Sequence, residues 1–407
     1  MSAKRVVLAY SGGLDTSVAV KWIQEEWNAE VIALAVDVGQ VPDADASYWD
    51  AILERAKAAG AVEAEVIDAK AEFASEYFGR ALKANALYEG KYPLVSALSR
   101  PVIVKHLVDA ARRYKGDAVA HGCTGKGNDQ VRFEVGVRTL NPSLEVLAPT
   151  RVWGFTRDDS IEYAERFGIP INVSKAKPYS IDENLVGRAI ECGEMEDPWA
   201  APPSDIYDLT SHVSDAPSVP REVVIGFERG LPISLDGELM PMERLVPLMG
   251  EIAGSYGYGR IDMVENRRVG IKSRETYECP GSLALIVAHQ DLEGITMERD
   301  VMREKSRLES RYAELVYDGL WFSPLREALD AFIDSTQEHV TGEVRLLLEP
   351  GRCAPNGRRS PSGLYDYGLA TYEATDTFRH EDAAGFVRLW GLSAETWSRR
   401  QRPGGVV

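Results

Sequence analysis

The chain has 407 residues, of which 44% are hydrophobic and 27% charged, so it can form two to three domains with sizeable cores. This composition excludes fibrous and disordered classes. Aspartate and glutamate outnumber lysine and arginine by 63 to 46, and the resulting net charge of −17 would repel a polyphosphate backbone, so we expect no nucleic-acid partner.

The cysteines and the apolar runs indicate the compartment. Cys123, Cys192, Cys279 and Cys353 lie far apart, without CxxC or Cys/His ligand spacing, which argues against a disulfide framework and a zinc site. No apolar run approaches the ~20 residues of a membrane span. We therefore expect a cytoplasmic protein without membrane contact.

Residues 1–170 alternate between short apolar runs and helical spacing, which is typical of a βαβ series. A helix is expected from Ile103 to Tyr114, with Gly116 after its end at positive φ. Another begins with a capping box at Thr156 and ends at Gly168. Strands are expected at 6–10, 31–38, 62–67, 117–121 and 144–147. We predict a doubly wound parallel sheet of the α/β class, with a nucleotide beyond the carboxyl ends of its strands.

Residues 171–375 lose this alternation and are expected to form an α+β synthetase domain that binds amino acids. Five prolines between 193 and 220 predict a surface excursion. Runs at 222–228 and 232–235 predict a hairpin, and helices are expected at 241–253 and 281–306. Residues 376–407 are predicted to form an amphipathic oligomerisation helix, with four large apolar side chains for docking on a neighbouring subunit: Phe386, Leu389, Trp390 and Trp397.

The first strand leads into a loop suited to phosphate, Ser11-Gly12-Gly13-Leu14-Asp15-Thr16-Ser17, at the start of a helix. Two glycines followed by hydroxyl residues expose backbone N–H groups to an anion. The pattern GxxxxGK[ST] is absent, so this is not a Walker A loop. The alternative is a serine- and glycine-rich turn with an ordinary helix N-cap.

This loop resembles that of the N-type ATP pyrophosphatases, which cleave ATP between its α- and β-phosphates. The string AYSGGLDTS, with HGCTGKGNDQVRFE at 121–134, KPYSIDEN at 177–184 and ENRRVGIKSRETYECP at 265–280, resembles the argininosuccinate synthase family. The resemblance implies an ATP-dependent ligase of arginine biosynthesis that joins citrulline to aspartate through a citrullyl-AMP and releases argininosuccinate, AMP and pyrophosphate. It also implies Mg²⁺ and a homotetramer.

The resemblance further implies which residues bind each substrate. The implied ATP contacts are Ala9, Tyr10, Ser11, Gly12, Gly13, Leu14, Asp15, Thr16, Ser17, Val36 and Gly122. The implied aspartate contacts are Thr124, Asn128 and Asp129, and the implied citrulline contacts are Tyr92, Asn128, Arg132, Ser180, Glu265 and Tyr277. Asp15 is also a candidate metal-facing catalytic residue, because a carboxylate beside a pyrophosphate needs a bridging cation.

The residues alone leave other interpretations open. The loop 122–129 could be an ordinary turn, and the segment holding Glu265 and Tyr277 a solvated ion-pair strand. Asp37 is a weak candidate, since an aspartate after a strand often caps a helix. Arg352, Arg358 and Arg359 are expected in a solvated or intersubunit turn.

Two positions depart from the family pattern, because Ala97 and Ala189 stand where hydroxyl residues that bind citrulline are usual.

Two rival functions remain open at this point. A tRNA thiolase would need a catalytic cysteine pair and a basic face. A nucleotide-binding regulator would keep the fold without turnover.

Overall fold

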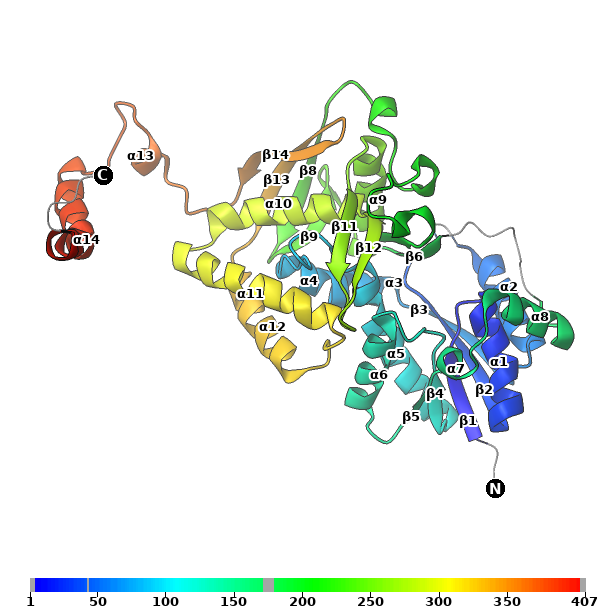
Figure 1. Ribbon diagram of the computed structural model, residues 1–407. Helices are drawn as coiled ribbons and strands as arrows, with labels where there is room; N and C mark the ends of the chain where they lie inside the picture. Colours follow the sequence, from blue (N-terminus) through cyan, green and yellow to red (C-terminus); the bar gives the residue numbers. More distant parts are fainter. Residues whose placement is uncertain (1–3, 42–43, 171–178, 403–407) are drawn as a thin grey trace. The chain divides into compact units, whose positions relative to one another are not determined.

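The computed structural model describes residues 4–41, 44–170 and 179–402 (Figure 1). The chain divides into two compact units between Ser362 and Gly363, and each is described by itself. Three β-sheets lie in the described part of the first unit. None of the described helices is both long and apolar enough to cross a membrane.

A five-stranded parallel sheet is built from the first part of the chain. Its strands are β1 (Lys4–Ala9), β2 (Ala29–Asp37), β3 (Glu63–Asp68), β4 (Ala118–Ala120) and β5 (Glu145–Leu147). They lie in the order β3-β2-β1-β4-β5, and every neighbouring pair is parallel. The predicted doubly wound sheet is confirmed, and the strand order reverses between β1 and β4, where a ligand is expected.

Helices cover both faces of this sheet (Figure 1). They are α1 (Leu14–Trp27), α2 (Ala46–Ala58), α3 (Lys70–Glu72), a π-helical turn (Phe73–Phe78), α4 (Gly79–Lys83), α5 (Val95–Tyr114), α6 (Asp129–Leu140), α7 (Pro149–Val152) and α8 (Arg157–Phe167). Val6 and Leu8 belong to one apolar cluster, with Val18 of α1, whereas Val7 belongs to another, with Leu107 of α5. Because successive strand side chains point to opposite faces, β1 is buried on both.

Helix α5 differs from its prediction at both ends. It already begins at Val95 and contains Pro101 in its second turn, where the missing N–H removes one helix hydrogen bond without ending the helix. At the other end Lys115 adopts the left-handed conformation, with φ 55°, so the positive φ expected at Gly116 is wrong. Gly116 instead donates its N–H to the carbonyl of Ala111 at 2.7 Å.

The capping box of α8 is confirmed. Thr156 Oγ1 accepts from the Asp159 N–H at 3.2 Å, and Asp159 Oδ2 accepts from the Thr156 N–H at 2.7 Å. The helix ends at Gly168, with φ 64°, as expected.

Antiparallel strands form the other two sheets, which have the orders β10-β9-β8-β13-β14 and β11-β12-β7-β6. Their strands are β6 (Ser180–Asn184), β7 (Gly187–Glu191), β8 (Arg221–Glu228), β9 (Leu231–Leu235), β10 (Glu238–Leu239), β11 (Arg260–Asn266), β12 (Lys272–Glu278), β13 (Gly342–Glu349) and β14 (Arg352–Arg359). The hairpin of β8 and β9 confirms its prediction.

The expected arginine turn is wrong, because Arg352, Arg358 and Arg359 lie on β14. This strand is at a sheet edge and pairs only with β13 among the described strands, so charged side chains replace the apolar alternation that would have marked it. Arg358 forms an ion pair with Asp291 at 2.7 Å.

The helices of this second part are α9 (Met242–Ser255), α10 (Pro280–Thr296), α11 (Arg299–Tyr317) and α12 (Pro324–Thr336). The single helix expected at 281–306 is wrong, because α10 ends at Thr296 and the Glu298 carboxylate caps the start of α11. The excursion at 193–220 contains short 3₁₀ turns and is anchored by buried Met195 and Ile206.

The second unit contains α13 (Tyr367–Ala370) and α14 (His380–Gln401). The helix predicted near the C-terminus is confirmed, and neither helix buries a residue. Six large apolar side chains of α14 are 46–79% exposed: Phe386, Val387, Leu389, Trp390, Leu392 and Trp397.

Candidate active site

The loop after β1 has the geometry of a phosphate cradle. Gly12 adopts φ 76°, a conformation that favours glycine, and its carbonyl accepts from Arg55 Nη1 of α2 at 2.6 Å. Gly13 is the N-cap of α1 and no side chain caps the helix, so its first backbone N–H groups are free to face an anion.

Hydroxyl groups hold this loop in place. Ser11 Oγ lies 3.1 Å from Thr16 Oγ1 and accepts from the Gly13 N–H at 3.3 Å. Ser17 is fully buried and its hydroxyl lies 2.9 Å from that of Tyr10. The Ser17 hydroxyl is thus used inside the protein, which gives this residue a structural part in the loop.

A cavity of about 380 Å³ lies over the loop, at the carboxyl ends of β1, β2 and β4. It is lined by nine of the expected ATP contacts: Ala9, Tyr10, Ser11, Gly13, Leu14, Asp15, Thr16, Val36 and Gly122. The expected contacts Gly12 and Ser17 are not among its lining residues. Sequence reasoning missed Tyr48 and Trp49, which α2 contributes; their only signal is their place in the connection after β2.

Asp15 lines this cavity from the first turn of α1. Burial raises the pKa of its carboxyl, and Arg157 opposes the increase. The described residues contain no group of three or more metal-ligating side chains. A single carboxylate nevertheless suits Mg²⁺, which binds proteins through one or two carboxylates while substrate phosphates and water complete its shell.

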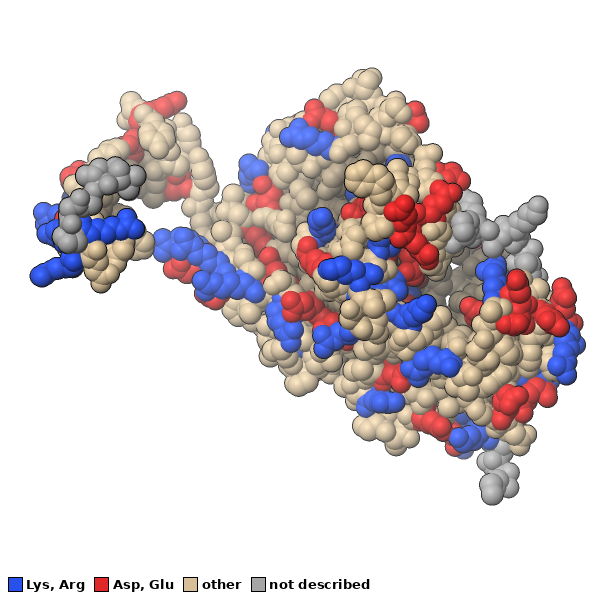
Figure 2. All heavy atoms as spheres, viewed as in Figure 1, with Lys and Arg blue, Asp and Glu red and all other residues tan. Residues whose placement is uncertain are grey.

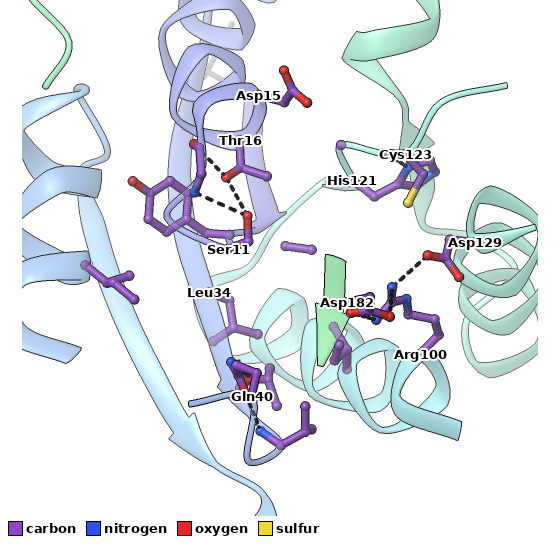
Figure 3. Close-up of a pocket in the computed structure, with 18 of the residues that line it drawn as sticks. Ser11, Asp15, Thr16, Leu34, Gln40, Arg100, His121, Cys123, Asp129 and Asp182 are labelled. Carbon is purple, nitrogen blue, oxygen red and sulfur yellow. Dashed lines mark hydrogen bonds and ion pairs between the residues drawn. The ribbon is translucent and has the colours of Figure 1, made fainter. Parts of the chain in front are cut away.

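Arg100 of α5 forms the far wall of the cavity, opposite Ser11 and Thr16 (Figure 3). Its Nη2 donates to Asp129 Oδ2 and to Asp182 Oδ2, both at 2.7 Å. Burial would raise the pKa of Asp129, but Arg100 and Arg132 lower it to about 2. Asp129 is therefore ionised at neutral pH.

A second cavity, of about 400 Å³, lies on the other side of Arg100. All the expected amino-acid contacts line it: Tyr92, Thr124, Asn128, Asp129, Arg132, Ser180, Glu265 and Tyr277. It shares six lining residues with the first cavity: Ser11, Arg100, Gly122, Cys123, Asp129 and Asp182. Lys177 and Pro178 of the third motif lie outside the described residues.

Asn128 and Arg132 both hold Tyr317 at the end of α11. Asn128 Nδ2 donates to the Tyr317 hydroxyl at 2.8 Å, and Asn128 Oδ1 accepts from the Arg268 N–H at 2.8 Å. Arg132 Nε donates to the Tyr317 carbonyl at 3.0 Å. The amide of Asn128 is thus engaged within the protein and fixes the wall of the cavity.

Glu265 is buried, at 1% exposure, so the alternative of a solvated ion-pair strand is wrong at this position. Its carboxylate accepts from the hydroxyls of Tyr277, at 2.7 Å, and Tyr317. Burial and the neighbouring Glu275 raise the pKa of Glu265 to about 7, against the effect of the two tyrosines.

Five charged lining residues and one tyrosine were missed by sequence reasoning: Arg100, Asp182, Glu191, Arg267, Glu275 and Tyr317. Asp182, Arg267 and Glu275 lie inside the conspicuous strings at 177–184 and 265–280, so their signal was present. Nothing in the sequence around Tyr317 distinguishes it from a core tyrosine.

Asp37 does not cap a helix. Its carboxylate accepts from the Gly39 N–H and pairs with Lys70.

The two departures from the family pattern lie in different surroundings. Ala189 lines the second cavity and stands opposite Tyr277 in the pairing of β7 with β12. Ala97 is 1% exposed within the apolar core and does not line that cavity, whereas Ser96 does.

The parallel sheet and its phosphate loop make the first part of the chain a nucleotide-binding domain of the HUP class, and residues from before and after position 170 together line the charged cavity. A family model described as the arginosuccinate synthase N-terminal HUP domain matches residues 5–170. One described as the arginosuccinate synthase C-terminal domain matches residues 179–397. The chain belongs to the argininosuccinate synthase family of ATP-dependent ligases, which act in arginine biosynthesis.

Two solved structures show weaker similarity. One is a tRNA thiolase, NcsA from Methanococcus maripaludis, with 18% identity and a TM-score of 0.26, where the match covers 44% of this chain and 60% of that one. The other, with 14% identity and a TM-score of 0.27, is a predicted subunit of tRNA methyltransferase from Methanocaldococcus jannaschii, where the match covers 40% of this chain and 74% of that one. This chain thus spans less than two thirds of the thiolase chain.

Proposed function

We propose that the protein joins citrulline to aspartate with cleavage of ATP to AMP and pyrophosphate. The observation that supports this most is the shared wall of the two cavities, which contains Ser11, Arg100 and Asp129. A nucleotide over the phosphate loop and an amino acid beside Glu265 would meet across that wall. Holding both reactants in this way raises their effective concentration.

The reaction proceeds in two displacements. The ureido oxygen of citrulline attacks the α-phosphorus of ATP, which forms citrullyl-AMP and releases pyrophosphate. The amine of aspartate then attacks the ureido carbon and displaces AMP. When bound with the nucleotide, Mg²⁺ would neutralise charge on the departing pyrophosphate, and Asp15, which lines the first cavity, would hold it.

The chain's own residues bind and orient the substrates. The free N–H groups at the start of α1 stabilise the phosphates, with Ser11 and Thr16 beside them. Asp129, ionised between Arg100 and Arg132, accepts the ammonium group of aspartate. Glu265 accepts that of citrulline.

The same proposal covers the partners and the compartment. A cytoplasmic enzyme without a nucleic-acid partner accords with the net charge of −17 and with the intermixed basic and acidic side chains on the face in Figure 2. We expect the homotetramer that the family resemblance implies, and the exposed apolar side chains of α14 support association of some kind.

The test of the reaction is product analysis with purified protein. Over many turnovers AMP and pyrophosphate should appear in equal amounts, and only when citrulline and aspartate are both present with ATP; citrulline and ATP alone should release at most one pyrophosphate per active site. ADP and orthophosphate as the first products would overturn the proposal. Turnover that requires a tRNA in place of citrulline would do the same.

The test of assembly is removal of residues from 381 onward. Light scattering should then report a smaller number of subunits per particle. An unchanged number would show that α14 is not needed for association. Substitution of Trp390 by Ser, which removes one exposed apolar side chain and keeps the helix, provides a milder variant.

A further inference from the structure

The citrulline end of the second cavity holds more carboxylates than its cations can neutralise. Glu191, Glu265 and Glu275 all line it, and Arg267 is the guanidinium beside them. Arg267 forms ion pairs with Glu191 and with Glu275, the latter at 2.9 Å. Arg132 is already paired with Asp129 at 2.8 Å. Among the residues that the structure describes, Glu265 therefore has tyrosine hydroxyls as its closest partners and forms no ion pair of its own.

The hydrogen bonds around Glu265 can be assigned one by one. Asn128 Oδ1 accepts from the Arg268 N–H, so Asn128 Nδ2 is the donor toward the Tyr317 hydroxyl. Because that hydroxyl accepts from Asn128, its own hydrogen is directed to Glu265 Oε1. Tyr317 thus satisfies one oxygen of Glu265 and has no hydrogen left for another group.

The second oxygen of Glu265 shares its donor with Glu275. The Tyr277 hydroxyl lies 2.7 Å from Glu265 Oε2 and 2.8 Å from Glu275 Oε2. A phenol has one hydrogen and can donate to only one of these oxygens. The other contact would bring two lone pairs together at hydrogen-bond distance, unless a carboxyl group carries a proton and donates it to the Tyr277 oxygen.

We propose that, in the ligand-free protein, one proton is shared along the chain Glu265–Tyr277–Glu275, and that the ammonium group of citrulline displaces it on binding. The O–H bond of the carboxyl group breaks and its proton passes to the solvent. The N–H groups of the ligand replace it as donors, and the ligand's positive charge balances the newly ionised carboxylate.

The surroundings make this exchange feasible near neutral pH. Tyr277 is fully buried and stacks on Tyr92, with ring centroids 4.1 Å apart. Bulk water therefore does not reach the Tyr277 hydroxyl between the two glutamates. The groups that face Glu265 come from four elements: Glu275 and Tyr277 of β12, Tyr317 of α11, Arg132 of α6, and Tyr88 and Tyr92 before α5. Burial, followed by the charge of Glu275, raises the pKa of Glu265 to about 7.

This inference rests on the proposed function, since it assigns the ligand as citrulline. It makes uptake of that substrate dependent on pH. The proton and the ammonium group of citrulline compete for the same carboxylates. Because fewer protons are bound at higher pH, the affinity for citrulline rises with pH. With a pKa near 7, the affinity should increase about tenfold from pH 6 to pH 8 and level off above that.

The experiment is calorimetric titration of the full-length protein with citrulline, with α,β-methylene-ATP present throughout. Runs at one pH in two buffers that both titrate near that pH, phosphate and imidazole at pH 6 or HEPPS and Tris at pH 8.5, separate the protons released from the binding enthalpy, because the two buffers of each pair differ in ionisation enthalpy. We expect close to one proton released per citrulline at pH 6 and almost none at pH 8.5. Equal enthalpies in both buffers at pH 6, with citrulline bound, would overturn the inference and leave the proposed function intact.

Two substitutions identify the source of the proton. In Glu275→Gln the amide can donate to the Tyr277 oxygen, so proton release at pH 6 should fall to near zero while citrulline still binds. Asp262→Asn is the matched control: Asp262 is on the same strand as Glu265, is exposed and pairs with Arg274, so release should persist.

Full proton release from a folded Glu275→Gln variant would overturn the inference that Glu275 shares this proton. If this variant does not fold, the pH dependence of the unaltered protein decides, and a flat affinity between pH 6 and pH 8 overturns the inference. An absence of citrulline binding at every pH would overturn the proposed function itself, and the inference with it.

Discussion

The two cavities that share Arg100 are built in different ways. The first cavity, for which we propose the nucleotide, has as its polar floor one short loop after β1, which presents backbone N–H groups and small hydroxyl side chains. The second cavity, which we propose binds the amino acids and call the amino-acid cavity, gathers charged side chains from α5, α6, β6, β7, β11 and β12, together with Tyr317 at the end of α11. Substitutions in the first cavity should therefore affect the chemical step, and those in the second the binding of one substrate.

Asp15→Asn tests the nucleotide side and should have the largest effect. If Asp15 holds the metal-bound pyrophosphate, kcat should fall by about 100-fold or more, with little change in the KM of either amino acid. Steady-state pyrophosphate release measures both. Asp50→Asn, an exposed aspartate on α2, is the matched control and should keep full turnover. Unreduced turnover of Asp15→Asn would remove this residue from the chemistry.

Asp129→Ala and Glu265→Ala test the opposite cavity. Each removes an acceptor for one ammonium group, so the first should raise the KM for aspartate and the second that for citrulline, by about 10- to 100-fold. Steady-state kinetics with each substrate varied in turn gives the comparison. Asp129→Asn and Glu265→Gln keep the side-chain size and show whether charge is responsible. Equal effects of one variant on both substrates would mean that the amino-acid positions are coupled or misassigned.

Arg100→Lys tests the wall between the cavities. A lysine ammonium lacks the planar fork that lets Arg100 contact Asp129 and Asp182 together, so the wall should loosen. We expect the KM for ATP and that for aspartate to rise together, each by about tenfold. Initial rates at varied ATP and varied aspartate check this. A change in only one of the two would show that the cavities act independently in spite of their shared residues.

The same contrast explains what the sequence could predict. The phosphate loop is local: a strand, two glycines and a helix start within a few residues, so its chemistry follows from neighbours in the chain. Gly12 and Ser17 show what such local reasoning does not reveal. Both lie within the loop, yet neither lines the cavity, because the direction of each group depends on Arg55 and Tyr10.

The amino-acid cavity required contacts between distant segments. Glu265 appeared among interspersed charges that usually mark a solvated strand, but Tyr317, 52 residues later, buries it. Tyr317 reaches this place because α10 and α11 are separate helices. Apolar residues continue at helical spacing across Glu298, so periodicity does not reveal that one helix ends and another begins there. Glu298 can cap α11 only because the backbone turns at this residue. The β14 edge strand was missed for a related reason, since its arginines carry no period-two apolar pattern.

Ala189→Ser should have the smallest effect and sharpens the comparison within the second cavity. Ala189 lines that cavity opposite Tyr277 and away from the nucleotide loop, so a new hydroxyl there can reach citrulline alone. One added hydrogen bond contributes about 0.5–1.5 kcal/mol, so the KM for citrulline should change by less than about tenfold, with that for aspartate nearly unaltered. Initial rates at varied citrulline and varied aspartate measure both constants.

Ala97→Ser is the matched comparison: Ala97 is buried in the apolar core, so the new hydroxyl should lower the melting temperature without improving citrulline binding. If Ala189→Ser altered the aspartate constant and left that of citrulline unchanged, the assignment of citrulline to the β7–β12 side of the cavity would have to be abandoned.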